Sequence, residues 1–443
     1  MREASALVEV LEALAARHEC AEVYAKTGWS RRFDLENGVE GAVSSRESGW
    51  SARAGDSRSS FFFASAGAPR LDCELPSPTP GGLRLPPSEP AGKWEEDDTV
   101  STPLLGELEG RRLVRALAST LEAEAPNAWL RLVILEDGVS DVEVASSTGV
   151  EASFRNRLAT LRIQAIEPET GGQAEIYVAG RCAHDFQAQA TARRIADLLF
   201  IAREGRSVSE AGVRALLSPE VATAILDSMS PLFVRSDSSP RWLRPGNEVA
   251  GSAVTVIDDG RCLVGLVRSP VDGEGVPTGP LALIDRGCVG EPIRPWWSPE
   301  RSPSAALRGC RLRAGWRDLP RTGSTHLYFD PSPDVSVASL LSAVERGYYL
   351  IDALGPCSLD PESGSFSLPC CGFEVERGRA AGPIHDVRLE GRLQGFLKGL
   401  RAVARDLTFL PRTSIVGSPS ILVEGLDLRG GSGAPFPPSL AFS

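Results

Sequence analysis

The chain has 443 residues, and its 47 lysines and arginines against 58 aspartates and glutamates give a formal net charge of −11. A hydrophobic content of 42% with 24% charged residues is typical of a globular protein of two or three domains and excludes a disordered chain. The acidic excess predicts no nucleic-acid partner, and the lack of an apolar run of about 20 residues predicts no membrane partner. Nine scattered cysteines and a polar N-terminus predict reduced thiols and a cytoplasmic location.

The first half of the chain combines helical and strand-like patterns. Apolar residues recur at helical spacing between Leu7 and Leu14, and residues 21–66 are predicted to form short strands separated by turns at 36–38 and 54–56. Two further helices are predicted over 104–124 and 185–203, and four strands over 128–136, 141–148, 159–166 and 174–180. We therefore expect an α+β fold whose N-terminal domain, residues 1–205, holds an antiparallel sheet with helices.

A proline-rich segment interrupts this first domain. Six prolines fall within residues 76–90, and four consecutive acidic residues follow at 95–98. Proline lacks the backbone donor that helices and central strands need, so we expect a long surface loop over residues 68–103.

The second half is richer in strands and glycine and predicts a β-rich domain over residues 206–430. A strand over 213–217 runs into a helix that Ser218 caps and Pro219 begins. A hairpin is predicted around residues 258–260, between strands at 253–257 and 262–267. The other expected elements are a helix over 337–344 stopped by Gly347, a helix over 393–400, a strand over 421–426 and a disordered tail over 431–443.

The residue patterns of common catalytic sites are missing. Zinc peptidases hold their metal with two histidines about one helical turn apart, but no two of the four histidines of this chain lie four or five positions apart. The adjacent Cys370 and Cys371 point to opposite sides of a strand, which favours a buried structural role over a shared metal or redox site.

Two other segments leave their function open. Asp272 and Glu274 lie in a glycine-rich stretch, residues 272–278, where the carboxylates either bind a cation or serve a tight turn. Trp296 and Trp297 form either a core or interface anchor or an exposed aromatic contact. Residue chemistry alone therefore stops at a two-domain α+β protein without a recognisable catalytic constellation.

Several short segments of the second half, taken in order, resemble the TldD/PmbA family and within it the PmbA (TldE) branch. Residues 219–222 read P-E-V-A, residues 272–278 match a D-x-E-G-x-P-T turn, and residues 323–328 resemble a G-x-T-N-L-Y strand with His326 in place of asparagine. The remaining segments are 283–287, 364–367, 372–378, 382–385 and 418–426, with Ser365 where aspartate is usual. The resemblance covers residues 208–430 well and residues 1–205 more weakly.

The resemblance implies a heterodimer in which a TldD-like partner carries the zinc and a PmbA-type subunit completes a chamber for peptides. The metal subunit bears H-E-x-x-x-H on the helix that here begins after Ser218, together with a cysteine near its C-terminus. At the matching positions this chain has Asp227, Ser228 and Leu232, and its segment 411–417 has no cysteine. We therefore expect no catalytic residue, metal ligand or cofactor in this chain, with zinc in the partner subunit.

By the same resemblance, extended or unfolded peptides enter the chamber and pair with strand edges, and some relatives mature peptide precursors or cleave amides in natural-product synthesis. The candidate chamber residues are Asp227, Asp272, Glu274, His326 and His385. We thus expect a non-catalytic subunit of a metallopeptidase. The alternatives are a regulatory or binding protein without hydrolytic function, and an atypical metallohydrolase acting alone through His326, His385, Asp272 and Glu274.

Overall fold

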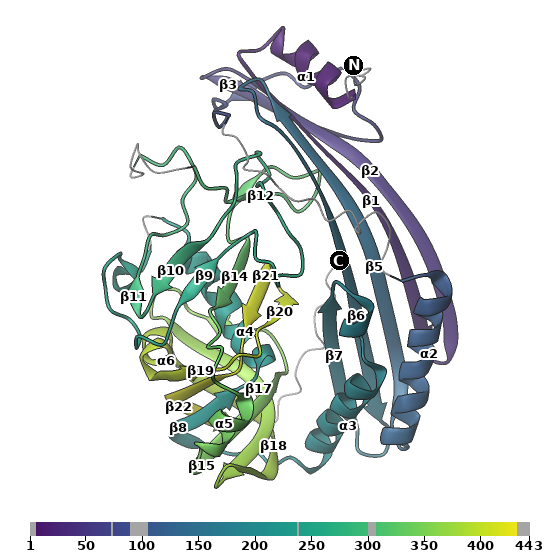
Figure 1. The fold of residues 1–443 in the computed structure, drawn as a ribbon, viewed down its shortest axis with the longest axis vertical. Helices are drawn as coiled ribbons and strands as arrows, with labels where there is room; N and C mark the ends of the chain where they lie inside the picture. The colour runs from purple at the N-terminus through teal and green to yellow at the C-terminus, as the bar shows by residue number, and fades with distance from the viewer. Residues whose placement is uncertain (1–5, 72–73, 89–104, 237–238, 300–306, 432–443) are drawn as a thin grey trace.

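The computed structural model describes residues 6–71, 74–88, 105–236, 239–299 and 307–431, and it divides into two parts (Figure 1). The N-terminal part is one large sheet with three α-helices, and the C-terminal part contains two further large sheets with three more. The predicted α+β fold class is confirmed. Within the described residues, no helix combines the length and the apolar character that crossing a membrane requires.

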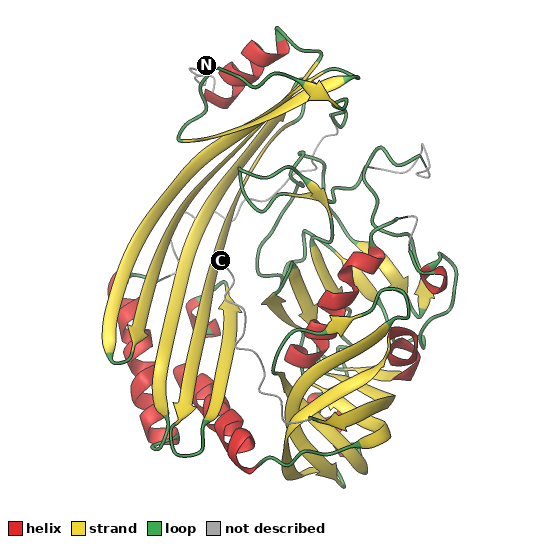
Figure 2. Cartoon of the chain, turned by 180° about the vertical axis from the view of Figure 1, so that it is seen from behind, coloured by secondary structure: helices red, strands yellow, loops and turns green. Residues whose placement is uncertain are grey.

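The N-terminal sheet is antiparallel, and its strands follow the order β4-β3-β2-β1-β5-β6-β7. The strands are β1 (Cys20–Glu36), β2 (Val39–Gly55), β3 (Ser59–Ala66), β4 (Thr79–Pro80), β5 (Trp129–Ser146), β6 (Glu151–Glu167) and β7 (Gly172–Gly180). Figure 2 shows the long strands curving past the C-terminal part.

The prediction of short strands is wrong for this sheet, although the turn at 36–38 is where it was expected. Residues 128–136 and 141–148 belong to the single strand β5, which has 18 residues. Asp137 and Gly138 interrupt the apolar pattern, but Gly138 pairs with Ser30 of β1 and with Leu158 of β6. Because a strand on each side supplies hydrogen bonds, the ladder continues through a glycine that sequence reasoning takes for a break.

Three helices cover the ends of this sheet: α1 (Ala6–Ala15), α2 (Glu107–Glu124) and α3 (Ala188–Glu204). α2 and α3 lie together near one end and α1 near the other (Figures 1 and 2). Leu117 and Leu121 of α2 and Ile195 of α3 are buried against sheet residues that include Val133 and Leu161. All three helices lie close to their predicted ranges.

The proline-rich segment is only partly a free surface loop. Thr79 and Pro80 form the short edge strand β4, an edge position where proline needs no donor for the ladder. Leu83 and Leu85 are buried. Residues 72–73 and 89–103 of the predicted loop, and residues 432–443 of the predicted tail, lie outside the described residues.

In the C-terminal part, one sheet joins β8 (Glu210–Leu217), β15 (Arg346–Ala353), β16 (Ser358–Leu359), β17 (Ser365–Glu376), β18 (Arg379–Arg392), β19 (Leu400–Val403) and β22 (Ile421–Gly430). A second sheet joins β9 (Val256–Asp258), β10 (Leu281–Asp285), β11 (Cys288–Val289), β14 (His326–Phe329), β20 (Thr408–Pro411) and β21 (Ile415–Ser418). A short hairpin adds β12 (Arg311–Leu312) and β13 (Arg321–Thr322).

Helix α4 (Pro219–Met229) connects these two sheets. It packs on β15 of the first sheet and on β21 of the second, and Val221, Ile225 and Met229 are fully buried. The Ser218 side chain accepts a hydrogen bond from the Val221 N–H, so the predicted cap is confirmed. The other elements are α5 (Val337–Ser342), α6 (Leu393–Gly399) and the short 3-10 helices η2 (Ala183–Asp185), η3 (Ser230–Phe233) and η4 (Arg241–Leu243).

The predicted hairpin around residues 258–260 is wrong. β9 pairs with β10 and β14, while residues 259–265 form successive tight turns in which Cys262 donates to the Asp259 carbonyl and Gly265 to the Cys262 carbonyl. The turn residues were recognised, but the partner strands are distant in sequence.

Two element ends also differ from the sequence prediction. Helix α5 ends at Ser342 rather than near Gly347, which lies in β15, where a Cβ would come 2.2 Å from the Arg214 carbonyl oxygen. The last strand, predicted to end at residue 426, continues to Gly430.

Cys370 and Cys371 are both buried in β17 and face different cores. Cys370 belongs to the core of the C-terminal part, and Cys371 packs with the core under α2 and α3 of the N-terminal part. The buried structural role predicted for the pair is thus confirmed, and burial raises the pKa of the Cys370 thiol to about 12. Cys371 and its neighbours join the two parts.

Gly275 lies at a second contact between the two parts, where the packing is close. Gly275 has a φ of +79°, and a Cβ there would lie 2.3 Å from the Val150 Cγ1 of the N-terminal part. We expect Gly275→Ala to lower the free energy of unfolding by about 2 kcal/mol or more, through backbone strain and overpacking. Gly279→Ala is the matched control, since nothing lies within 4 Å of its Cβ position. Urea unfolding of both variants gives the comparison, and equal effects would contradict a close fit at Gly275.

Candidate functional site

The C-terminal end of α4 is where the resemblance locates the metal ligands of the catalytic branch. Asp227 lies in its last turn, and its Oδ2 accepts a hydrogen bond from the Thr413 hydroxyl at 3.1 Å. Its Oδ1 is buried and has no hydrogen-bond partner among the described residues. Burial raises the pKa of the Asp227 carboxyl, while the bond from Thr413 opposes that rise.

The surroundings of Asp227 supply few further ligands. The Ser228 hydroxyl donates to the Ile225 carbonyl within the helix, and Leu232 packs against the apolar core of the C-terminal part. Arg412 donates to the Glu220 carbonyl, so a guanidinium lies along the same helix. One carboxylate beside a cation and a partly buried leucine does not fit a zinc ion, which needs at least three convergent protein ligands in a catalytic site.

The turn at 272–278 is largely buried and held by hydrogen bonds, and it is not an exposed loop. The Asp272 carboxylate is buried and accepts four backbone hydrogen bonds, from Glu274 and Val276 on Oδ1 and from Cys310 and Arg311 on Oδ2. Burial raises the pKa of Asp272 to about 7, against the opposing effect of these donors. The tight-turn interpretation therefore describes Asp272, whose oxygens are occupied by the backbone.

Glu274 belongs to a buried network of charges between the two parts of the protein. Its carboxylate accepts a hydrogen bond from Arg53 of β2 at 2.9 Å, and Arg53 also pairs with Glu22 of β1, its cross-strand partner. Arg313 of the C-terminal part donates to Glu22 as well. Two carboxylates and two guanidiniums are thus enclosed together, which compensates charges that would be costly to bury alone.

The charge network keeps Glu22 in its ionised form. Burial alone would raise the pKa of Glu22, but the guanidiniums of Arg53 and Arg313 outweigh it and hold that pKa below its usual range. Burial also lowers the pKa of Arg313. The network therefore fits a structural junction between paired charges.

The two tryptophans lie beside this junction. The indole N–H of Trp296 donates to Glu274 Oε2 at 3.2 Å, and the Arg311 guanidinium lies 4.9 Å from the ring centroid of Trp297. Trp296 fits the predicted anchor, whereas Trp297 is partly exposed. Sequence reasoning did not connect these tryptophans to the 272–278 turn.

His326 begins β14 and is enclosed by the turns at 259–265. It is 1% exposed, neither ring nitrogen has a hydrogen-bond partner among the described residues, and Phe409 packs edge-on at 6.0 Å between ring centroids. Burial lowers its pKa to about 4, so the imidazole is neutral at pH 7.

His385 lies elsewhere, on β18 where that strand passes the linker after α3. Its backbone N–H donates to the Arg206 carbonyl, and burial lowers the pKa of its ring. Asp272 and Glu274 share one turn, whereas His326 and His385 lie in other surroundings, and these four residues do not assemble into a metal site in the described part of the chain.

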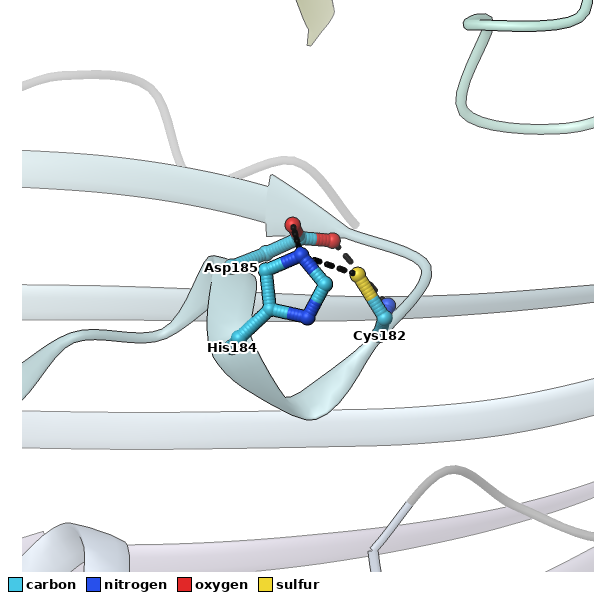
Figure 3. Close-up of side chains that lie close together, drawn as sticks. All are labelled: Cys182, His184 and Asp185. Atoms are coloured by element: carbon cyan, nitrogen blue, oxygen red, sulfur yellow. Dashed lines mark hydrogen bonds and ion pairs between the residues drawn. The ribbon is translucent and has the colours of Figure 1, made fainter.

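The structure gathers three other metal-ligating side chains that sequence reasoning missed. Within the described residues, Cys182, His184 and Asp185 are the one group of three whose ligand atoms lie within 4.8 Å of one another (Figure 3). They occupy the short turn η2 directly after β7. The sequence signal is a cysteine two positions before a histidine just after a predicted strand, a spacing that neither a histidine pair nor a pair of cysteines reveals.

With this geometry described, comparison with known proteins is informative. Residues 210–430 match the PmbA/TldA metallopeptidase C-terminal domain. The chain belongs to the PmbA/TldD family. The predicted family is thus confirmed for the part where most of the resembling segments lie.

Curated relatives match only part of this chain. A metalloprotease PmbA homolog from Haemophilus influenzae is 24% identical over 186 residues, which are 42% of this chain and 38% of the relative. A metalloprotease from Methanothermobacter thermautotrophicus is 27% identical over 163 residues, which are 36% of this chain and 35% of the relative. The chain therefore spans between a third and two fifths of the length of these relatives.

Solved structures match nearly the whole chain in fold. TldE from Thermococcus kodakarensis superposes with a TM-score of 0.81 at 15% identity and covers 96% of this chain and 100% of its own. A Thermotoga maritima protein, described as a candidate modulator of a DNA gyrase, gives a TM-score of 0.76 at 18% identity over 95% and 99%. At these identities the likeness concerns the fold, including the N-terminal part that the family match leaves out.

The charge network predicts a large effect of removing one member. Glu22→Ala leaves Arg313 buried without its paired carboxylate and Arg53 with Glu274 alone, and we expect a loss of about 3–5 kcal/mol in the free energy of unfolding. Glu40→Ala is the matched control, because Glu40 pairs with Arg115 at the surface of the same sheet and its removal should change stability far less. Chemical denaturation measures both, and similar losses would show that burial of the network does not matter.

The buried histidine predicts a pH dependence of stability. Because the pKa of His326 is lower in the folded chain, the unfolded chain binds the proton first as the pH falls from about 6.5 to about 4. Across that window the free energy of unfolding of the unmodified chain should fall by up to about 3 kcal/mol because of His326. We expect His326→Asn to abolish this fall. Denaturant midpoints measured from pH 4 to 8 test this, with parallel behaviour of both proteins above pH 7. An identical slope below pH 6.5 would contradict the expectation.

Proposed function

We propose that this chain is a non-catalytic, TldE-like subunit of a two-chain metallopeptidase, whose zinc and catalytic groups belong to a TldD-like partner. The observation that carries the proposal is the end of α4. At the positions where the resemblance requires two histidines and a glutamate, this chain has Asp227, Ser228 and Leu232, and the partly buried Leu232 packs against the core. A chain of this family without these ligands needs another polypeptide for hydrolysis.

The shape of the N-terminal sheet supports a peptide as the substrate. β7 is its edge strand on the side of the C-terminal part (Figure 1), and no described strand pairs with the outer edge of β7. An extended peptide gains affinity from main-chain hydrogen bonds to such an edge without requiring particular side chains. Binding of this kind suits unfolded or precursor peptides whose sequences vary.

The two alternative functions receive less support. A hydrolase acting alone through His326, His385, Asp272 and Glu274 would need these side chains to converge, and they form no ligand group within the described residues. A regulatory role is suggested only by the description of structural relatives as candidate gyrase modulators. A net charge of −11 disfavours direct contact with DNA.

Co-expression with a TldD-like chain bearing H-E-x-x-x-H tests the proposal. We expect the two chains to co-purify and an unfolded peptide such as casein to be cleaved by the pair but not by this chain alone. Replacing the glutamate of that motif in the partner should abolish cleavage and leave the complex intact. Casein hydrolysis by the isolated chain, or failure of the chains to associate, would overturn the proposal.

A further inference from the structure

The turn that follows β7 holds three side chains with different metal-binding chemistry. Cys182 Sγ lies 3.3 Å from His184 Nε2, and the same nitrogen lies 3.8 Å from Asp185 Oδ1. Figure 3 shows the thiol, the imidazole and the carboxylate turned toward one another above the turn. A thiol, an imidazole and a carboxylate are all ligands that Zn²⁺ accepts.

These spacings match the edges of a tetrahedral coordination shell. Zn–S distances of about 2.3 Å and Zn–N or Zn–O distances of about 2.0–2.2 Å place neighbouring tetrahedral ligands about 3.3–3.6 Å apart. The observed separations lie within a few tenths of an ångström of that range. An ion would therefore need only small side-chain adjustments.

Asp185 is already oriented by the backbone. Its Oδ2 accepts hydrogen bonds from the N–H groups of Arg181 and Cys182, at 2.8 and 3.0 Å, which leaves Oδ1 on the side of His184. Ligating carboxylates in metal sites are commonly fixed by such outer hydrogen bonds. The turn thus holds one ligand in place before any ion binds.

The electrostatic balance also favours a divalent cation. A thiolate and a carboxylate together carry two negative charges, and the Arg181 guanidinium is directed away to the carbonyls of Leu263 and Gly265. The His184 side chain is 82% exposed, which leaves room for a fourth ligand from solvent.

The location gives the site a role apart from the zinc of the proposed partner. The turn contacts residues 263–265 of the C-terminal part through Arg181, and Leu263 and Val264 are 73% and 69% exposed there. It also adjoins the end of the edge strand β7. An ion here would stiffen the contact between the edge strand and the C-terminal part.

We propose that Cys182, His184 and Asp185 form a binding site for one Zn²⁺-class transition-metal ion, with water as the fourth ligand. The inference concerns this chain alone and does not depend on the proposed metallopeptidase function. Its site lies outside α4 and outside the 272–278 turn.

Titration of the reduced, metal-free chain with Co²⁺ and Zn²⁺ tests the site. We expect one equivalent of Co²⁺ to produce a thiolate-to-cobalt charge-transfer absorption that Zn²⁺ displaces. Cys182→Ser should abolish this absorption. His184→Ala, a change at an exposed position, should weaken binding at least about tenfold.

Cys288→Ser is the matched control, because Cys288 is an exposed cysteine in the C-terminal part. It should bind Co²⁺ like the unmodified chain, and circular dichroism should show that all variants are folded. The proposal is overturned by binding of less than about half an equivalent, or by a signal that survives Cys182→Ser. It is also overturned by equal affinities of His184→Ala and the unmodified chain. Casein cleavage by the two-chain complex is a separate measurement, so failure of one proposal is distinguishable from failure of the other.

Discussion

The enclosed charges of Glu22, Arg53, Glu274 and Arg313 are the constraint on which the arrangement of the protein depends. Each carboxylate in this network contacts a guanidinium, and two of the pairs, Arg53–Glu274 and Arg313–Glu22, cross from the N-terminal sheet to the C-terminal part. Burying such charges is costly unless every partner is present. The two parts therefore have a fixed relative position, because a shift by one residue in β1 or β2 would leave a charge without compensation.

A second, apolar junction complements the first. Cys371 of β17 packs into the core beneath α2 and α3, and α3 also contacts β18. The two junctions differ in chemistry. The apolar junction stabilises the contact by burying nonpolar surface, but it does not fix one orientation. The ionic junction fixes the orientation and adds little net stability. Together they hold the edge strand β7 and the turn after it beside the C-terminal part (Figure 1).

Local features of the sequence predicted the structure well where a short segment decides the outcome. The cap at Ser218, the turn at 36–38 and the helical spacing in α3 depend on residues within a few positions of each other, and all three are present. The opposite directions of Cys370 and Cys371 follow from strand geometry alone. The family resemblance also rests on short segments, so it can be recognised from the sequence without knowledge of the fold.

Features that depend on pairing across long distances were not accessible. Arg313 and Glu22 are 291 positions apart, and no pattern within either segment indicates the other. The partner predicted for β9 was the next segment of the chain. Its true neighbours, β10 and β14, lie much further along the sequence. The uninterrupted β5 was divided because Gly138 weakens a strand in isolation, and only β1 and β6 on its flanks restore the ladder.

The candidate metal residues show why α4 retains its form without the zinc ligands of the catalytic branch. Val221, Ile225 and Met229 are fully buried between two sheets, and the helix is capped by Ser218, so its stability comes from packing and capping. Leu232 extends the same apolar contacts where the resemblance expects a histidine. Among the described residues, the buried Oδ1 of Asp227 has no hydrogen-bond partner, which is a polar cost at this end of the helix. Helix α4 is thus held in place by its packing and by its cap.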